Sequence, residues 1–367
     1  MANISRRDLL KGLAVSAFTA AAGRGAPWLG NEALDFLVVG DSIIWGQGLE
    51  EKDKFYTLTT DWLRSLGRDV RLKLKAHSGS SLKFHPEEAA AYRKISRDET
   101  FYYKPEVNVG FPSTWKQLEI AANEYKAEGK SRGADLIMLT GGITDITVRK
   151  VLDPFRDKDL LPPLIRKYCR DHMFDVIDLG ATNNPDALIA VIGYFPMISP
   201  STPSSKLLNH WLESMDVPDI FKPLLNNPLM RPLFFKRLKN KGIIRSRIWY
   251  TESNKYLAEA VDKLNAKYGK TRAVFIKSPI TEVTSLETPE TLLFRMNKNG
   301  SVEDPLFLSR SADCNEALPR LKKETGIDYP VRLCEIAAVG HPNAAGSRAY
   351  AEVIKTALAP YFAGHAS

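Results

Sequence analysis

Four short polar blocks contain the residues of this chain that could do chemistry. They are GDS (residues 40–42), HSG (77–79), GGITD (141–145) and GHPN (340–343). Ser42 offers a hydroxyl group and its own backbone amide, and Gly79 allows backbone to approach a bound group closely, with its N–H as a donor. Each block alone is also explained as a structural turn. A functional site is therefore inferred only from the order of the four blocks and from their placement in the fold.

Five apolar runs, rich in β-branched residues, indicate strands: 35–39, 70–76, 134–139, 187–194 and 273–276. Most are nearly continuous rather than alternating, as in strands covered on both faces. Amphipathic patterns at 54–66, 115–129, 160–178, 251–268 and 344–361 predict helices. Such alternation predicts a parallel sheet flanked by helices, with ligands bound beyond the carboxyl ends of the strands. The first three polar blocks follow the first three strands and should therefore share that edge.

Together, and in this order, the four blocks resemble those of the SGNH or GDSL hydrolase superfamily over residues 35–361. GDSIIWGQGL (40–49) and HSGSS (77–81) reproduce the pattern of a bacterial subgroup. The resemblance implies an α/β fold, a three-layer flavodoxin-like sandwich with a parallel sheet. It also implies ester hydrolysis through an acyl-serine intermediate, with no cofactor. The GxSxG elbow of α/β-hydrolases does not occur in the sequence.

The resemblance also assigns roles to individual residues. Ser42 is the expected nucleophile and His341 the base that accepts its proton, because a serine hydroxyl is inert without a neighbouring base. The backbone amides of Ser42 and Gly79 are expected to donate to the oxyanion. Asn343 is also predicted to cap the last helix. The supporting residues of these blocks are Asp41, Asp145 and Asn343.

Two positions depart from the superfamily pattern. The third block normally supplies an Asn side chain as the last oxyanion donor, and Thr144 occupies that place, so its hydroxyl is the expected substitute donor in the oxyanion hole. The triad acid is usually an Asp three residues before the histidine, and that residue is Ala338. We expect a main-chain carbonyl to orient His341, with Glu335 and Asp313 as the alternatives. The remaining histidines are interpreted as surface or loop residues: His77, His85, His172, His210 and His365.

The composition, with 44% hydrophobic and 26% charged residues, is that of a globular protein and excludes mainly disordered classes. Residues 33–367 are predicted as one hydrolase domain with three insertions, at about 83–112, 196–250 and 280–334, of the kind that usually form lids or binding loops. Residues 200–250 hold nine Lys or Arg but three acidic residues, interleaved with large apolar side chains. A basic surplus confined to one segment argues against a nucleic-acid-binding protein. It suits contact with an anionic membrane surface, and the alternative is a helical lid packed on the core.

The N-terminus predicts export. Residues 1–22 resemble a twin-arginine signal peptide, with SRRDLLK at 5–11 and small residues at 20–22, so a periplasmic or secreted protein is expected. In an oxidising compartment we expect Cys314 to pair with Cys334, which would tether the loop before His341, and Cys169 to be a buried apolar residue. No HExxH or cysteine spacing indicates a metal site.

The predicted function is therefore an exported serine esterase or lipase that acts on an acyl ester, with a Ser–His dyad. The Phe-, Leu- and Met-rich residues 220–238 favour a hydrophobic acyl group. One alternative is an O-acetyl esterase for a cell-envelope polysaccharide, with sugar contacts from Tyr102, Tyr103 and Trp115. Another is a non-catalytic ligand-binding protein on the same scaffold, which Thr144 and Ala338 suggest.

Overall fold

The computed structural model describes residues 33–101, 103–203 and 231–363, and in this part of the chain a parallel sheet has the strand order β2-β1-β3-β4-β5. In register, Phe36 of β1 lies opposite Leu72 of β2 and Leu136 of β3. The predicted flavodoxin-like sheet is confirmed, and the order reverses between β1 and β3, where such folds bind ligands. The strands are β1 (Leu34–Val39), β2 (Val70–Leu74), β3 (Leu136–Leu139), β4 (Leu188–Ile192) and β5 (Ala273–Ile276).

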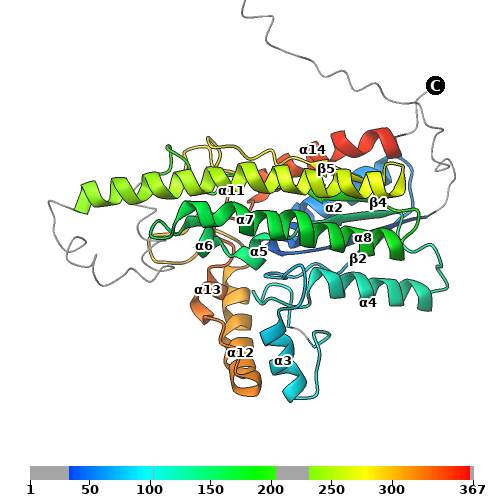
Figure 1. The fold of residues 1–367 in the computed structure, drawn as a ribbon, viewed down its shortest axis with the longest axis horizontal. Coiled ribbons are helices and arrows are strands. Elements are labelled where there is room, and N and C mark those ends of the chain that lie inside the picture. The colour runs from blue at the N-terminus through cyan, green and yellow to red at the C-terminus, as the bar shows by residue number, and fades with distance from the viewer. Residues whose placement is uncertain (1–32, 102, 204–230, 364–367) are drawn as a thin grey trace, which may run out of the picture.

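Helices cover both faces of the sheet (Figure 1). One face carries α4 (Thr114–Ala127), α8 (Met173–Asn183) and α11 (Arg231–Tyr268), and the other carries α2 (Phe55–Ser65) and α14 (Ala344–Phe362). Every residue of β1, β3 and β4 is buried, which explains the continuous apolar runs. The three-layer α/β/α sandwich is thus observed.

Two helical predictions differ from the structure in extent. The pattern predicted as a helix at 160–178 is helical without a break from 161 to 183, with a π-helical stretch inside it, and the helix predicted at 251–268 begins twenty residues earlier, at Arg231. Residues 231–250 are helical because Phe235, Leu238 and Trp249 are buried against the sheet layer, so this part of the second insertion belongs to the core. The segments are η2 (Lys158–Leu160), α7 (Leu161–Arg166), the π-helical η3 (Lys167–His172) and α8.

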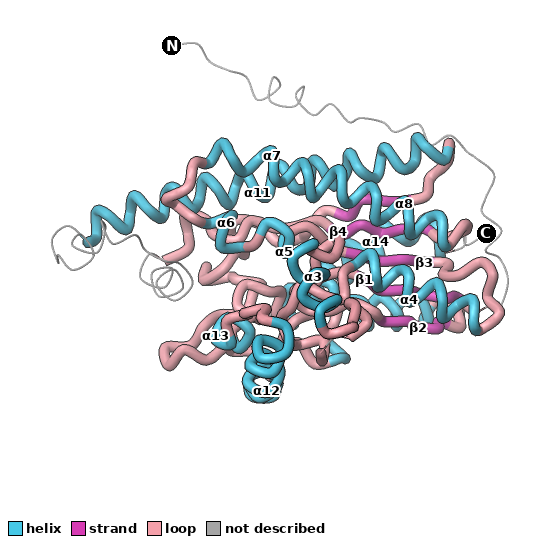
Figure 2. The backbone as a smooth tube through the Cα atoms, turned by 60° about the horizontal axis from the view of Figure 1, so that its bottom comes forward, coloured by secondary structure: helices cyan, strands magenta, loops and turns pink. Residues whose placement is uncertain are grey.

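The first and third insertions pack together in one side lobe, which we define as residues 83–112 and 304–335. It contains α3 (Pro86–Lys94), α12 (Phe307–Thr325) and α13 (Val331–Glu335), which lie together outside the two helical layers (Figures 1 and 2). The lobe has its own apolar core, which includes Tyr92, Val109, Phe111, Leu318 and Leu321. These insertions therefore form a packed unit, where the sequence suggested lids or loops.

The cysteines are arranged as predicted. Cys314 of α12 and Cys334 of α13 form a disulfide within the side lobe, with their Cα atoms 6.0 Å apart, and Cys169 is free and buried. His77 lies in the loop after β2, one of the two placements that were expected, and it is fully buried there, with its ring nitrogens 2.9 Å from the carbonyl oxygen of Ser78 and 3.0 Å from that of Tyr103.

Short helices complete the described chain. They lie near the carboxyl ends of β1 and β3 or follow them, and they are α1 (Ser42–Trp45), η1 (Glu51–Asp53), α5 (Ile143–Ile146) and α6 (Val148–Leu152). Within the described ranges, no helix combines the length and apolar character needed to cross a bilayer. The predicted signal peptide and residues 204–230 of the basic insertion lie outside these ranges.

Candidate active site

Ser42 lies on a turn that hydrogen bonds hold at the carboxyl end of β1. Asp41 caps α1 by accepting a hydrogen bond from the backbone amide of Ile43, at 3.0 Å. Its carboxylate also accepts hydrogen bonds from the hydroxyl of Thr140 (2.6 Å), after β3, and from that of Tyr194 (2.7 Å), after β4. Burial raises the pKa of Asp41, and these hydrogen bonds oppose that effect. Asp41 thus connects the turn of Ser42 to two neighbouring strands.

The histidine of the fourth block reaches this serine. His341 Nε2 lies 2.7 Å from Ser42 Oγ, although 299 positions separate the two residues in the sequence. The loop of His341 is fixed by Phe294, whose backbone amide donates to the carbonyl of His341 (2.9 Å) and whose carbonyl accepts from Gly340 (3.0 Å). Asn343 caps α14 through the amides of Ala345 and Gly346, as predicted. The arrangement places a base directly on the serine hydroxyl.

The imidazole of His341 is half-buried, and its pKa is lowered to about 4. Burial is the main cause, the positive charge of Arg310 adds to it, and nearby backbone groups of Ala337, Ala338 and Val339 act in the opposite direction. At neutral pH the ring is therefore uncharged and free to accept a proton. This is the state that a general base requires.

Neither predicted acidic alternative orients His341 in this structure. The carboxylate of Glu335 accepts from Ser311 (2.8 Å) and Asn315 (2.7 Å), and that of Asp313 pairs with Lys104 (2.7 Å). Within the described residues Nδ1 of His341 makes no hydrogen bond of normal geometry. The backbone groups at 337–339 are thus the remaining partners for the ring, and orientation by a main-chain carbonyl stays a prediction.

Two backbone amides are available beside the serine. Among the residues that the structure describes, neither the N–H of Ser42 nor that of Gly79 donates to another protein group. Gly79 has a φ of 80°, and a Cβ atom there would lie 2.3 Å from Oδ1 of Asn108 and 2.6 Å from the carbonyl oxygen of Val109. Only glycine fits this position, so the loop presents backbone where a side chain would otherwise stand.

The third block has a structural role in this conformation. The hydroxyl of Thr144, proposed as a substitute oxyanion donor, donates its only proton to the carbonyl of Ser80, at 2.6 Å. The carboxylate of Asp145 accepts from the amide of Leu82 at 3.1 and 3.3 Å, and burial raises its pKa to about 6. Both residues therefore hold the loop that follows Gly79.

Gln117 is a site residue that the sequence analysis missed. Its side chain accepts from the amide of Gly40 (2.6 Å) and donates to the carbonyls of Gly40 (3.2 Å) and Pro112 (3.0 Å) and to Ser80 Oγ (2.9 Å). It thereby joins the first polar block to the loop of the second. The one signal in the sequence is a polar residue on the buried face of a predicted helix, beside Leu118 and Ala121.

Sugar contacts and metal ligands receive little support from the described residues. Tyr103 packs against Phe101 in the side lobe, Trp115 packs against the main core, and Tyr102 lies outside the described ranges. No cluster of three or more His, Cys, Asp or Glu side chains suited to a metal ion is found in those ranges.

Comparison with known proteins gives similarity of structure only. No family model matches the sequence, and no curated protein matches it. The chain is similar to an extracellular lipase from Streptomyces rimosus, with 14% identity, a TM-score of 0.43, and coverage of 89% of this chain and 100% of that one. It is also similar to a phospholipase A1 from Streptomyces albidoflavus, with 12% identity, a TM-score of 0.41, and coverage of 89% of this chain and 100% of that one. A third similar structure is a family 2 carbohydrate esterase from Corynascus thermopiles, with its carbohydrate-binding domain. The identity is 14%, the TM-score is 0.40, and the match covers 93% of this chain and 70% of that one.

Proposed function

We propose that this protein is a serine ester hydrolase that uses Ser42 and His341. The observation that carries the proposal is the 2.7 Å contact between Ser42 Oγ and His341 Nε2, with the free amides of Ser42 and Gly79 beside it. A nucleophile, an uncharged base and two backbone donors are the groups that acyl transfer needs. The motifs that resemble the SGNH or GDSL superfamily agree with this assignment.

In the proposed reaction, Ser42 Oγ attacks the ester carbonyl carbon while its proton moves to His341 Nε2. The carbonyl oxygen becomes an oxyanion that accepts from the amides of Ser42 and Gly79. The bond to the alcohol oxygen then breaks, and His341 gives that oxygen its proton, which leaves an acyl group on Ser42. A water molecule, deprotonated by His341, then attacks the acyl carbon, the bond from that carbon to Ser42 Oγ breaks, and His341 returns the proton to Oγ, which releases the acid and restores the serine.

The proposal is tested with a panel of nitrophenyl esters of increasing acyl length, measured on wild-type protein and on Ser42→Ala. Turnover that Ser42→Ala abolishes supports the enzyme, and a profile that rises with acyl length supports a lipase. Release of acetate from acetylated polysaccharide but not from longer esters would support the O-acetyl esterase. Rates for wild type and Ser42→Ala that both equal the uncatalysed background would favour the non-catalytic binding protein.

We also propose contact with an anionic membrane surface through the N-terminal part of α11. There the side chains of Leu233 and Ile244 are 67% and 46% exposed, next to the exposed cations Lys236, Arg237 and Lys241. Basic residues beside exposed apolar ones suit anionic lipid, at about 1 kcal/mol for each cation near the surface.

Vesicle flotation tests the membrane contact. Replacing Lys236, Arg237 and Lys241 with Gln should abolish binding to phosphatidylserine vesicles at low salt while soluble-ester turnover is retained. The matched control replaces three exposed lysines elsewhere, Lys126, Lys270 and Lys298, with Gln. If wild type does not float with anionic vesicles, or if both triple variants lose binding equally, the proposal is wrong.

We also propose export through the twin-arginine route, because residues 1–22 resemble its signal peptide. Fractionation of bacterial cells should place wild-type protein in the periplasm or medium, and Arg6→Lys/Arg7→Lys should retain it in the cytoplasm. Export that is unaffected by this double substitution would contradict the twin-arginine assignment.

A further inference from the structure

Four charged side chains form a buried cluster between the nucleophile turn and the side lobe. Arg310 of α12 has no exposed surface and makes two hydrogen bonds to Asp304, at 2.8 and 2.7 Å, and one to Glu106, at 3.1 Å. Lys54 is also buried, and its ammonium lies 3.2 Å from the centre of the Trp45 ring. The two acids thus face Arg310, while Lys54 pairs with Glu51 at 3.6 Å and interacts electrostatically with Glu106. Burying ions is costly, so a cluster of this kind asks for an explanation beyond stability.

The cluster contacts the segment that directly follows Ser42. The carboxylate of Glu106 accepts from Trp45 Nε1 (2.7 Å), from Gln47 Nε2 (3.1 Å) and from the amide of Gly48 (3.4 Å). These residues form the WGQG part (45–48) of the GDSIIWGQGL motif, to which the proposed reaction gives no role. The motif therefore supplies the hydrogen-bond donors that hold the carboxylate of Glu106.

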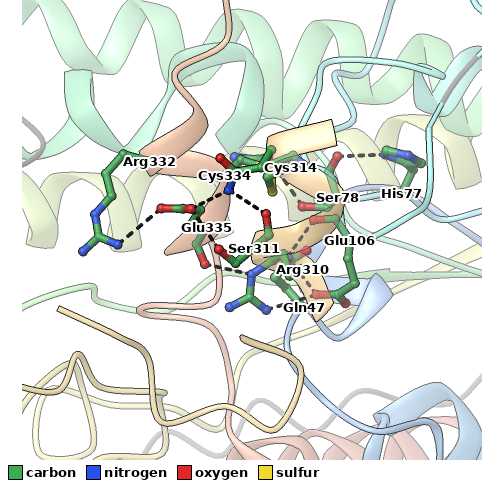
Figure 3. Close-up of a disulfide and its surroundings, with 12 residues drawn as sticks. Gln47, His77, Ser78, Glu106, Arg310, Ser311, Cys314, Arg332, Cys334 and Glu335 are labelled. Atoms are coloured by element: carbon green, nitrogen blue, oxygen red, sulfur yellow. Dashed lines mark hydrogen bonds and ion pairs between the residues drawn. A yellow bond between two sulfur atoms is a disulfide. The ribbon is translucent and has the colours of Figure 1, made fainter. Parts of the chain in front are cut away.

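The same cluster contacts the segment that leads to His341 (Figure 3). Nε of Arg310 donates to the carbonyl of Glu335, at 3.0 Å, at the end of α13. The disulfide joins α12 to α13 one residue earlier, at Cys334. Three residues later, the carbonyl of Ala338 accepts from the backbone amide of His341 at 3.0 Å.

Gly48 brings the two segments into direct contact. Its φ is 83°, and a Cβ atom there would lie 2.8 Å from Cβ of Ala338 and 2.9 Å from Cβ of Asp304. The backbone at Gly48 therefore packs against the side chain of Ala338, three residues before His341, and leaves no room for a side chain of its own. A shift of this loop would move the base away from the serine.

We propose that Arg310, held by Glu106 and Asp304, is a positioning residue that fixes the loop of His341 relative to the turn of Ser42. The inference rests on the proposed function, because the geometry that it protects is the contact between nucleophile and base. Arg310 acts through the carbonyl of Glu335 and through its charge, and it does not touch the serine. The charge is felt by His341, since the guanidinium contributes to the lowering of the pKa of that imidazole.

The first test measures the pKa of His341 and needs no ester turnover. In the Ser42→Ala background, isotope-labelled histidine NMR follows the titration of His341, assigned by its loss in His341→Ala. The charged side chain that acts on this ring is Arg310 on α12, which is itself paired with Asp304 and Glu106. Removing the cation in Arg310→Met should raise the pKa of His341 by about one unit or more. An unchanged pKa would overturn the electrostatic part of the proposal.

The second test separates positioning from folding. Arg310→Lys keeps the charge but cannot make the paired contacts to Asp304 and also reach the carbonyl of Glu335. We expect kcat to fall by about 10- to 100-fold per active site, with KM within about twofold, because the loop moves slightly. Active sites are counted by titration with a serine-directed phosphonate. If Arg310→Met fails to fold, Arg310→Lys still tests whether Arg310 positions the loop of His341.

Arg272→Met is the matched control. Arg272 is a buried arginine that donates to the carbonyls of Ala181, Asn184 and Pro185 at the opposite edge of the sheet. Its loss should lower stability while kcat per active site and the pKa of His341 stay unchanged. If Arg310→Lys behaves like Arg272→Met, the positioning role is wrong. If wild type neither turns over esters nor reacts with the phosphonate, the proposed function has failed instead.

Discussion

The two halves of the candidate site are held by different means. The serine half is supported by hydrogen bonds from residues at the ends of neighbouring strands: Thr140 after β3 and Tyr194 after β4 both donate to Asp41. The histidine half depends on the side lobe, where a disulfide and the buried ion pairs of Arg310 hold the segment before His341. The sheet brings the first set of residues together, whereas the second set must be assembled from distant segments.

This difference indicates where the site is sensitive. Strands that pair in a sheet place their carboxyl ends at one edge, so the turn of Ser42 needs little additional support. The loop of His341 does not follow a strand of the sheet, and the backbone of Phe294 and the side-lobe segments around Glu106 and Arg310 hold it. We therefore expect changes in the side lobe to act on the base and changes at the sheet edge to act on the nucleophile.

The largest effect should come from the two reacting residues. Ser42→Ala and His341→Ala are each expected to lower kcat/KM for a nitrophenyl ester by at least about 10³-fold, because each removes part of one unit. For the same reason the double variant should be no worse than either single variant. Thermal unfolding should change little, and losses that multiply in the double variant would contradict a joint role.

Local patterns in the sequence were enough to predict the strands and the polar blocks. The apolar runs around β1 and β5 are short and continuous, and each observed strand lies within a few residues of its prediction. Polar residues directly after such runs must lie at the sheet edge, which is why Ser42 and Gly79 could be named in advance. The contact between Ser42 and His341 itself needed the resemblance to a known superfamily, since no periodic pattern connects them.

Long-range polar contacts could not be predicted in this way. Glu106 and Arg310 are ordinary charged residues in the sequence, and their burial follows only from the packing of two insertions against each other. Gln117 likewise has no neighbour in the sequence that signals its contacts with Gly40 and Ser80. The burial of His77 in its loop was not predictable either, because one of its two backbone partners, the carbonyl of Tyr103, depends on the fold of the side lobe.

A smaller effect is expected from the disulfide, which belongs to the histidine half. Cys314→Ala/Cys334→Ala should lower the free energy of unfolding by about 3 kcal/mol, since the bridge closes a loop of 20 residues. Reducing agent should destabilise wild type but leave the double variant unchanged, which is the control. Peptide mass spectrometry without reduction should find this link and a free Cys169, and a link that involves Cys169 would contradict the structure.

The next effect tests a carboxylate at the sheet edge. The pKa of Asp145 is raised to about 6 from 3.8, so the folded state holds the proton more tightly than the unfolded state. The stability that this proton gives is present below pH 3.8 and is lost as the pH rises through about 6. Asp145→Asn should therefore stabilise the protein by about 1–3 kcal/mol at pH 8 and leave it unchanged at pH 3.5, in urea titrations. A variant that is less stable than wild type at pH 8 would contradict this reasoning.

The smallest effect should come from Thr144. Its hydroxyl proton is donated to the carbonyl of Ser80, so Thr144→Val should change kcat by less than about threefold. A residue that donates to the oxyanion would instead cost about 10²- to 10³-fold in kcat. A loss of that size, with KM unchanged, would show that the hydroxyl turns toward the substrate during the reaction.

The most direct test of the central claim is the pH dependence of phosphonate labelling at Ser42, followed by intact mass and peptide mapping. Because burial and Arg310 lower the pKa of His341 to about 4, the labelling rate should rise with a midpoint near pH 4 and stay high at neutral pH. The label should map to Ser42 and be lost in His341→Ala. Labelling of another residue, or an equal rate in His341→Ala, would contradict a nucleophile activated by this histidine.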